Sequence, residues 1–363
     1  MPKRKGYSPI GIDLQANAAK MVQLHFGPQG ASVTGCKSVT FEEGLAQIVD
    51  QKPGRITHTL KQAIASGGFS GRRAVVTLPA AKVDVRTLTL AGSEDDLEKM
   101  LRWEAESYLH YDVSDASIDH AKLGEVTVGN EKRSEVMVAS ANKTYIRELL
   151  DLMAAAGLLV EAVDIVPMAL WRLGSRFGEE LQTPVSMIDI GRTSSVATIL
   201  NTGELRLTRT IARGGEELTA RIMQSLDVAR DEAELLKKEY GTGVPGNAAR
   251  FGSQDELVTK TEVAGTIHEI LRCDLEDMAE ELQKLFRYFS TQNKGMSVGR
   301  GYLCGGGSRL KGLDAFFTER IGVTIEQLPA LDIVLKTGST NGDETGPEYA
   351  VAAGLALRVD AKD

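Results

Sequence analysis

The feature that most constrains the fold is a repeated pattern: an apolar run ending in an acid, a short polar turn and a second apolar run. The first copy is "IGIDLQANAAKMVQLHF" and the second is "VSMIDIGRTSSVATIL". Aligned without gaps, Asp13 and Asp189 lie 176 positions apart, about half the chain length. Each copy predicts a β-hairpin. The spacing predicts two related lobes, although two unrelated hairpins would share the same local pattern.

Length, charge and cysteine content narrow the class of protein. A chain of 363 residues is long enough for two domains with a sizeable core. The net charge of −8 argues against broad binding to nucleic acid. Three widely separated cysteines indicate a reducing compartment, and the most apolar tract contains too many charges for a membrane span. We therefore expect a cytoplasmic protein with no nucleic-acid partner and no direct membrane insertion.

Strand-like and helix-like patterns alternate between the two hairpins. The segments "ASVTGCKSVTF", "RRAVVTLP", "VDVRTLTL" and "SEVMVASA" predict strands, and "ITHTLKQAIASGG" and "TYIRELLDLMAAAG" predict helices. A later helix, "EILRCDLEDMAEELQKLFRYFS", has apolar residues spaced alternately by four and three positions. That spacing is typical of a coiled-coil seam, but it extends over less than three heptads. We therefore expect this helix to pack across a lobe.

The two hairpins have the residue types of phosphate-binding loops, which need small residues, free backbone N–H groups and an acid for hydrated Mg²⁺. The second copy supplies Asp189, Gly191, Thr193 and Ser194. The first supplies Asp13, Asn17 and Lys20, but Gln15 and Ala16 stand where a glycine and a hydroxyl residue are expected. The Gln15 side chain would either crowd the phosphates or donate a hydrogen bond to them.

Three further segments predict ligand contacts, each with a structural alternative. Gly214 and Gly215 precede Glu216 and a helix, whose first N–H groups would face an anion or a ribose; such a pair is often purely structural. Glu234 and Lys237 lie three apart on a helix, where an ordinary surface ion pair is the alternative. Gly305, Gly306, Gly307 and Ser308 follow an apolar run, and we expect a flat ligand such as a nucleotide base to approach this main chain.

In this order the segments resemble the actin-like ATPase superfamily, and most closely the PilM family of type IV pilus assembly proteins and the related FtsA proteins. "AELLKKEYG", "GGGSRLKGL" and "EYAVAAGLALR" are similar to motifs of these families. The resemblance covers about residues 8 to 358. It implies an α/β fold of the actin-like, ribonuclease H-like type: two duplicated lobes with a small inserted α/β subdomain.

The resemblance also implies a site for ATP or ADP with Mg²⁺. The first phosphate loop would contain Asp13, Asn17 and Lys20, with Asp13 and Asp189 holding Mg²⁺ through water. The implied nucleotide contacts in the second half are Asp189, Gly191, Thr193, Ser194, Gly214, Gly215, Glu216, Glu234, Lys237, Gly305, Gly306, Gly307 and Ser308. Because Gln15 and Ala16 depart from the family pattern, we expect at most a weak ATPase, and no catalytic residue is identified.

The resemblance divides the chain into four parts. Residues 8–80 with 159–183 would form the first lobe, and residues 81–158 the inserted partner-binding subdomain. Residues 184–240 with 297–358 would form the second lobe, and residues 241–296 a helical subdomain.

The resemblance further implies a role as a cytoplasmic scaffold of the pilus assembly platform. Its partner would be the N-terminal cytoplasmic peptide of a PilN-like inner-membrane protein, bound in a groove beside the inserted subdomain; other pilus or secretion platform proteins are further expected partners. The protein would thus be peripheral at the inner membrane. Trp103, Tyr108 and Tyr111 are candidate anchor residues, with a place in the core as the alternative.

Three other functions remain open from the sequence. A GspL-like structural module of type II secretion would share the fold without using nucleotide, and Gln15 and Ala16 favour it. A sugar or acetate kinase would need a general-base acid in the first lobe, and no candidate is evident. An FtsA-like division protein would have a C-terminal amphipathic helix, whereas this sequence ends in the polar "ALRVDAKD".

Overall fold

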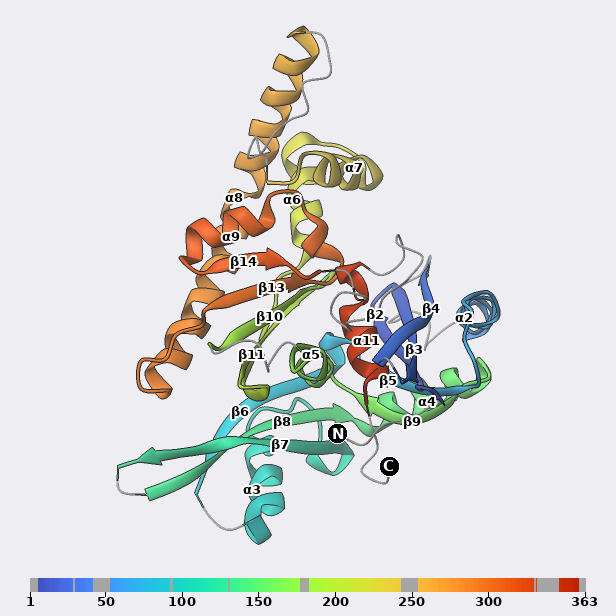
Figure 1. Ribbon diagram of the computed structural model, residues 1–363, viewed down its shortest axis with the longest axis vertical. Helices are drawn as coiled ribbons and strands as arrows, with labels where there is room; N and C mark the ends of the chain where they lie inside the picture. The colour runs from blue at the N-terminus through green and yellow to red at the C-terminus, as the bar shows by residue number, and fades with distance from the viewer. Residues whose placement is uncertain are drawn as a thin grey trace. The chain divides into compact units, whose positions relative to one another are not determined.

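The computed structural model describes residues 6–28, 30–41, 53–91, 94–129, 131–176, 183–242, 254–329, 331 and 346–358 (Figure 1). The chain divides into two compact units. Unit 1 contains residues 1–182, 198–210 and 329–363, and unit 2 contains residues 183–197 and 211–328. The described residues 346–358 therefore fall in unit 1, and the four-part division expected from the sequence, which assigns them to the second lobe, stays a prediction.

Unit 1 is built on a six-stranded sheet with the order β1-β3-β2-β5-β9, in which β4 also pairs with β3. β2 and β3 form the predicted antiparallel hairpin, and β2, β5 and β9 are parallel. The predicted third strand is β4. The bounds are β1 (Gly6–Tyr7), β2 (Ile10–Gln15), β3 (Ala18–Gly27), β4 (Gly30–Thr40), β5 (Arg73–Thr77) and β9 (Leu159–Asp164).

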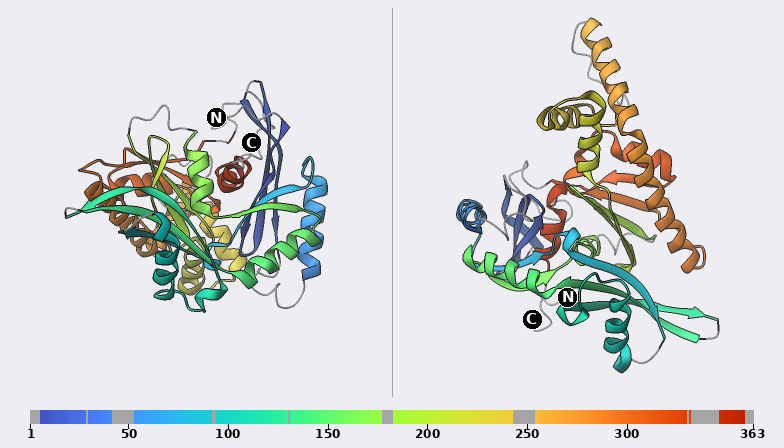
Figure 2. Two further views of the ribbon diagram at one scale, coloured as in Figure 1. Left: turned by 90° about the horizontal axis from the view of Figure 1, so that it is seen from below. Right: turned by 180° about the vertical axis from the view of Figure 1, so that it is seen from behind.

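Small residues allow a helix to pack directly on the central strand of this sheet. α11 (Ala350–Ala356) lies against β2 and against α5 (Val166–Gly174), as Figure 2 also shows. A Cβ atom on Gly11 would lie 2.0 Å from the carbonyl oxygen of Ala352, and one on Gly354 would lie 2.1 Å from that of Ala169. The motif "EYAVAAGLALR" therefore reflects close helix packing in unit 1. α2 (Pro53–Ser66) and α4 (Lys143–Ala155) also pack in this core.

The inserted subdomain is a three-stranded antiparallel sheet with the order β6-β8-β7 and a helix, α3. α3 covers one face, where Leu101 packs with Val136 and Val138. The opposite face carries Met137, which packs in a cluster with Ile165 near the start of α5. The bounds are β6 (Val83–Leu90), α3 (Glu94–Glu106), β7 (Ala116–Val128) and β8 (Glu131–Asn142).

The sheet of the second half has the order β12-β11-β10-β13-β14, and β10, β13 and β14 are parallel. Residues 198–210 of the β11–β12 hairpin belong to unit 1. The strand bounds are β10 (Val185–Ile190), β11 (Ser195–Asn201), β12 (Glu204–Ile211), β13 (Arg300–Cys304) and β14 (Thr324–Gln327), and the helices of unit 2 are α6 (Gly215–Leu226), α7 (Arg230–Tyr240), α8 (Gln254–Gln292) and α9 (Leu313–Ile321).

The long helix α8 packs within unit 2 through the predicted apolar seam. It contacts α6, α7 and α9. The seam residues are all buried: Leu271, Leu275, Met278, Leu282, Leu285 and Phe289. The expectation of a helix packing across its lobe is therefore confirmed. Among the described residues, no helix has the length and apolar character needed to cross a membrane.

Candidate functional site

The first acid-tipped hairpin, in unit 1, surrounds Asp13 with side-chain partners. Asp13 on β2 faces Lys20 on β3 across the antiparallel pair. Asp13 is 3% exposed, and its Oδ2 atom accepts a 2.8 Å hydrogen bond from Gln15 Nε2. The Thr77 hydroxyl donates to Oδ1 over 3.4 Å. Burial raises the pKa of Asp13 above its usual 3.8, while Lys20, Gln15 and Thr77 oppose that shift.

Gln15 therefore serves the hairpin itself. Its amide group, which the sequence left free to crowd or to bind a phosphate, donates to the acid two residues earlier. The hairpin turns at Ala16 and Asn17, and the Asn17 carbonyl accepts a 2.7 Å hydrogen bond from the Phe41 N–H group. The tip is thus tied to the chain that follows β4, and both carboxylate oxygens of Asp13 have protein partners.

The second hairpin, in unit 2, has a turn shaped by its backbone. Asp189 is the next-to-last residue of β10 and is 6% exposed. The Gly191 N–H group donates to the Ser194 carbonyl over 3.0 Å, and a Cβ atom on Gly191 would lie 2.6 Å from that oxygen. Glycine is therefore required for the turn to close this tightly. Thr193 at its tip is exposed.

The start of α6 braces this turn. The Gly215 N–H group donates to the Gly191 carbonyl over 3.0 Å, and the Glu216 N–H group donates to the Arg192 carbonyl over 2.7 Å. A Cβ atom on Gly214 would lie 2.5 Å from the Arg192 carbonyl oxygen. These two N–H groups therefore bond to the turn, and a nucleotide contact by Gly214, Gly215 and Glu216 stays a prediction.

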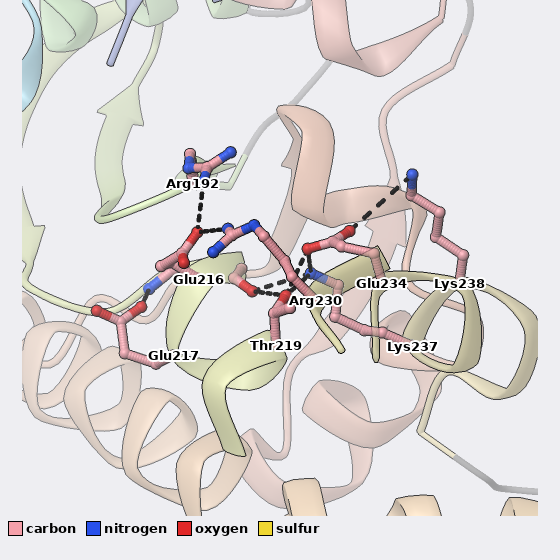
Figure 3. Close-up of polar contacts among 10 residues, drawn as sticks. Arg192, Glu216, Glu217, Thr219, Arg230, Glu234, Lys237 and Lys238 are labelled. Atoms are coloured by element: carbon pink, nitrogen blue, oxygen red, sulfur yellow. Dashed lines mark hydrogen bonds and ion pairs between the residues drawn. The ribbon is translucent and has the colours of Figure 1, made fainter. Parts of the chain in front are cut away.

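A buried network between α6 and α7 holds the same helix start from the other side (Figure 3). Lys237 is 9% exposed, and its Nζ atom donates to the Gly215 carbonyl, the Thr219 hydroxyl and the Glu234 carboxylate over 2.9, 2.5 and 2.7 Å. The alternative of an ordinary surface pair between Glu234 and Lys237 is therefore wrong. α6 and α7 pack together and enclose the ammonium group.

The pKa shifts in this network follow from burial and charge. Burial lowers the pKa of Lys237, and Glu234 only partly offsets that effect. For Glu234 burial acts in the raising direction, but hydrogen bonds from Lys237 and Thr219 outweigh it and lower the pKa. The pKa of Glu216 is lowered, first by its hydrogen bond from Arg230 and also by Arg192. The lowered pKa values of Glu234 and Glu216 favour their carboxylate forms, whereas burial disfavours the charged form of Lys237.

In the triple-glycine segment after β13, the structure explains why glycine is needed at two of the three positions. Gly305 has φ +82°, and a Cβ atom there would lie 2.3 Å from Asp189 Oδ1. A Cβ atom on Gly307 would lie 2.3 Å from Ile190 Cγ2. The close approach that the sequence assigned to a flat ligand is therefore made by β10 at these positions. Ser308 is buried, whereas Gly306 is exposed.

The motifs "AELLKKEYG" and "GGGSRLKGL" meet in unit 2. A Cβ atom on Gly241 would lie 2.3 Å from the Lys311 carbonyl oxygen, which accepts a 2.8 Å hydrogen bond from the Thr242 N–H group. Gly312 has φ +77°, and a Cβ atom there would lie 2.4 Å from the Thr242 hydroxyl. These glycines join the end of α7 to the segment before α9.

Unit 1 contains a cavity of about 510 Å³ beside the inserted subdomain, on the sheet face opposite α3. It exists because this face carries small side chains, since alternate residues of a strand share one face. Its floor includes Ser117, Ala121, Ala139 and Ala141, and its far wall includes Met168, Trp171 and Arg172 from α5. Sequence reasoning missed Trp171, whose side chain reaches the cavity only through the packing of α5.

The predicted anchor residues lie elsewhere. Trp103 on α3 is 70% exposed, and Tyr108 bonds to Ser140 and lies under Arg86. Neither these two side chains nor Tyr111 lines the cavity. The expectation that they anchor a peptide in this groove is therefore not supported.

Comparisons with known proteins identify the family. The profile described as "Type IV pilus assembly protein PilM" matches residues 11–249, more than half of the chain. The chain belongs to the PilM family. A profile described as "Cell division protein FtsA" also matches, over residues 186–354, so the family and its predicted relative are both found.

Solved structures give the same result. A structure described as "PilM-PilN type IV pilus biogenesis complex" matches with a TM-score of 0.77 and 25% identity, covering 98% of both chains. The ethanolamine utilization protein EutJ from Carboxydothermus hydrogenoformans matches with a TM-score of 0.54 and 15% identity, covering 98% of this chain and 91% of that chain. MreB5 of Spiroplasma citri bound to AMPPNP matches with a TM-score of 0.51 and 12% identity, covering 97% of this chain and 95% of that chain. These two likenesses show the fold alone. The predicted actin-like α/β fold is therefore confirmed.

A curated relative is the cell division protein FtsA of Bacillus subtilis (strain 168), which is 22% identical over 307 residues, 76% of this chain and 70% of that protein. FtsA of Streptococcus pneumoniae is 22% identical over 350 residues, 89% of this chain and 75% of that protein. These matches extend the FtsA likeness beyond the second half of this PilM-family chain.

The cavity of this PilM-family protein has a polar end. Asp164 Oδ2 lies 2.7 Å from Arg172 Nη2 and 2.7 Å from Arg358 Nη1, and all three residues line the cavity. Asp164 also accepts the Ile165 N–H group over 2.8 Å at the start of α5. Burial lowers the pKa of Arg172, which Asp164 counteracts. Two guanidinium groups share one carboxylate at this end, and Asp119 of β7 also lines the cavity.

Proposed function

We propose that this PilM-family protein is a scaffold of the type IV pilus inner-membrane assembly platform that docks the N-terminal cytoplasmic peptide of a PilN-like membrane protein. The observation that carries the proposal is the match over 98% of both chains to a structure described as a PilM-PilN complex. The peptide would hold the protein at the inner membrane.

The cavity in unit 1 is the proposed peptide groove. An extended peptide gains affinity from main-chain hydrogen bonds at a sheet edge and from side chains placed in pockets. β7 is an edge strand of the inserted sheet, and Ser117 and Ala121 on this strand line the cavity. Met168 and Trp171 supply an apolar wall, and the pair of Arg172 and Arg358 supplies hydrogen-bond donors at one end.

We further propose that the protein binds ATP or ADP with Mg²⁺ and hydrolyses ATP slowly or not at all. The second hairpin supports binding, because its turn is preformed and ends at a buried acid, Asp189. Mg²⁺ is commonly held by one or two carboxylates together with phosphate oxygens. The first hairpin fits less well, because both oxygens of Asp13 are engaged.

Peptide binding tests the first part of the proposal. Fluorescence anisotropy would measure a labelled synthetic peptide, the N-terminal cytoplasmic segment of the PilN protein of the same organism. Ala139→Leu fills the cavity floor and is expected to weaken binding at least tenfold, the equivalent of one lost apolar anchor of about 1.4 kcal/mol. Ala155→Leu, on an exposed position of α4, is the control. No binding by the unaltered protein, or equal binding by both variants, contradicts the proposal.

Calorimetry with ATP·Mg²⁺ tests the second part. Asp189→Ala is expected to abolish the binding heat, while Asp314→Ala, at an exposed position of α9, is expected to leave it unchanged. Absence of heat with the unaltered protein would favour a structural module that does not use nucleotide. Peptide docking and nucleotide binding would thus be judged separately.

A further inference from the structure

A second hollow lies beside the proposed peptide groove in unit 1. Its volume is about 370 Å³, and it is lined by β7, α5 and β12. β7 contains a bulge at this point, because its register with β8 shifts between Lys122 and Gly124. Bulges re-aim side chains, and here Leu123 is 4% exposed in an apolar cluster that includes Leu205 of β12.

The two hollows are adjacent and share part of their lining. Ala121, Met168 and Trp171 line both of them. Trp171 stands at their boundary in a fixed orientation, because its Nε1 atom donates a 2.9 Å hydrogen bond to the Gly203 carbonyl. A segment that runs along β7 from the first cavity would therefore meet the second hollow next.

The charged side chains at the second hollow form ion pairs with one another. Lys122 pairs with Glu125 over 3.3 Å, and Arg206 pairs with Glu204 over 2.5 Å. Arg206 also donates to the Leu123 carbonyl over 3.2 Å. These two acids and two bases leave no net charge at the second hollow. Between them the lining is apolar, which suits an apolar side chain.

We infer that the second hollow is an anchor pocket for one apolar side chain of the same partner segment that occupies the first cavity. This inference rests on the proposed peptide docking. The span of β7 from Ser117 to Glu125 lines one hollow or the other, and an extended chain advances about 3.3 Å per residue. A segment of about eight extended residues covers both hollows. Depending on the direction in which the segment runs along β7, the side chain in the second hollow comes after or before the residues that occupy the first cavity.

Gly124→Leu tests the inference by filling the second hollow alone. A Cβ atom on Gly124 would point toward Arg206 Nη1, 3.3 Å away, which is the movable end of a flexible side chain. Anisotropy would use a labelled 20-residue peptide from the N-terminal segment of the PilN protein of the same organism, together with truncations from each end. We expect Gly124→Leu to weaken the long peptide about tenfold, the value of one apolar anchor. Truncation of the peptide from one of its two ends should also weaken binding about tenfold. The truncated peptide should then bind Gly124→Leu and the unaltered protein with the same affinity.

Controls separate the possible failures. Gly265→Leu adds the same side chain at an exposed helical position with nothing within 4 Å, and it should bind like the unaltered protein. Gly124→Ala tests whether the strand tolerates substitution, and thermal unfolding by circular dichroism checks each variant. Equal binding of the long peptide by Gly124→Leu and the unaltered protein overturns the second pocket, while Ala139→Leu still reports on the first. Absence of peptide binding by the unaltered protein overturns both.

Discussion

The two acid-tipped hairpins share a sequence pattern but are held in place in different ways. In unit 1, Asp13 has partners in Gln15 and Thr77, so side chains stabilise the acid. In unit 2, the turn after Asp189 is held by main-chain hydrogen bonds from Gly191 and from the start of α6. In the first hairpin, each carboxylate oxygen of the acid already accepts one side-chain hydrogen bond. The second keeps its turn rigid through glycines and a helix start.

This difference indicates that hairpins with a similar sequence pattern can be stabilised by different contacts. A phosphate loop needs donors that point at the anion and an acid free for hydrated Mg²⁺. A preformed turn costs little entropy when a ligand binds. We therefore expect unit 2 to contribute more than unit 1 to any nucleotide affinity. Four predictions test the contrast.

Gly305→Ala should reduce the free energy of unfolding most, because it adds a methyl group where Gly305 packs against β10 of the second hairpin. Alanine at φ +82° costs about 1–2 kcal/mol in backbone strain, and its Cβ atom would clash with Asp189 Oδ1. With overpacking of about 1–3 kcal/mol, the free energy of unfolding of unit 2 should fall by about 4 kcal/mol. Urea unfolding followed by far-ultraviolet circular dichroism measures it.

Gly322→Ala is the matched control for that prediction. Gly322 has φ +75°, but nothing lies within 4 Å of its Cβ position. It should therefore show the backbone strain alone, about 1–2 kcal/mol. Equal losses in the two variants would mean that the approach of β10 to Gly305 is not the cause.

Lys237→Met should have the next largest effect, because it removes the brace on the other side of the second hairpin. The substitution leaves Glu234 and the Gly215 carbonyl without their ammonium partner. Loss of one member of a buried pair costs about 3 kcal/mol. Both tryptophans, Trp103 and Trp171, lie in unit 1, so circular dichroism is the appropriate probe. Lys238→Met, at a side chain 78% exposed, should unfold like the unaltered protein.

Elements and their periodicity were predictable because they depend on local sequence. The β2–β3 hairpin and the buried seam of α8 follow from apolar spacing alone. The residues around Trp171 were not predictable, because its hydrogen-bond acceptor is Gly203, 32 positions away. Arg358 and Asp164 are 194 positions apart and still share a bond at the cavity.

The meaning of the glycines was the least accessible part of the candidate site. A run of three glycines indicates that something approaches the main chain, and that much was correct. Sequence does not say whether the approaching group is a ligand or another strand, because both exclude a Cβ atom. At Gly305 and Gly307 the approaching group is β10. The sequence likewise did not say whether Glu234 and Lys237 form an ordinary surface pair, because that depends on the packing of α6 on α7.

Gln15→Leu should show a pH-dependent effect confined to the first hairpin. Because the Asp13 pKa is raised by burial, ionised Asp13 costs stability, and stability falls as pH rises from 3.8 toward the folded pKa. Removing the Gln15 hydrogen bond raises that pKa further. The decrease in the free energy of unfolding, relative to the unaltered protein, should therefore be about 1.5 kcal/mol larger at pH 7 than at pH 4. Urea unfolding followed by tryptophan fluorescence measures it. In an Asp13→Asn background this difference should vanish, and a persistent difference would contradict it.

Gln15→Gly should have the smallest effect, and it asks whether the first hairpin is a weakened phosphate loop. The change frees one oxygen of Asp13 and gives the turn a flexible residue, so ATP·Mg²⁺ should bind about fivefold more tightly, the equivalent of one net hydrogen bond of about 1 kcal/mol. Calorimetry on the unaltered protein and the variant measures it. Thr77→Val frees the other oxygen without altering the turn and separates the two causes. Unchanged affinity in both variants would mean that unit 2 alone determines nucleotide binding, because a freed acid in unit 1 would then contribute nothing.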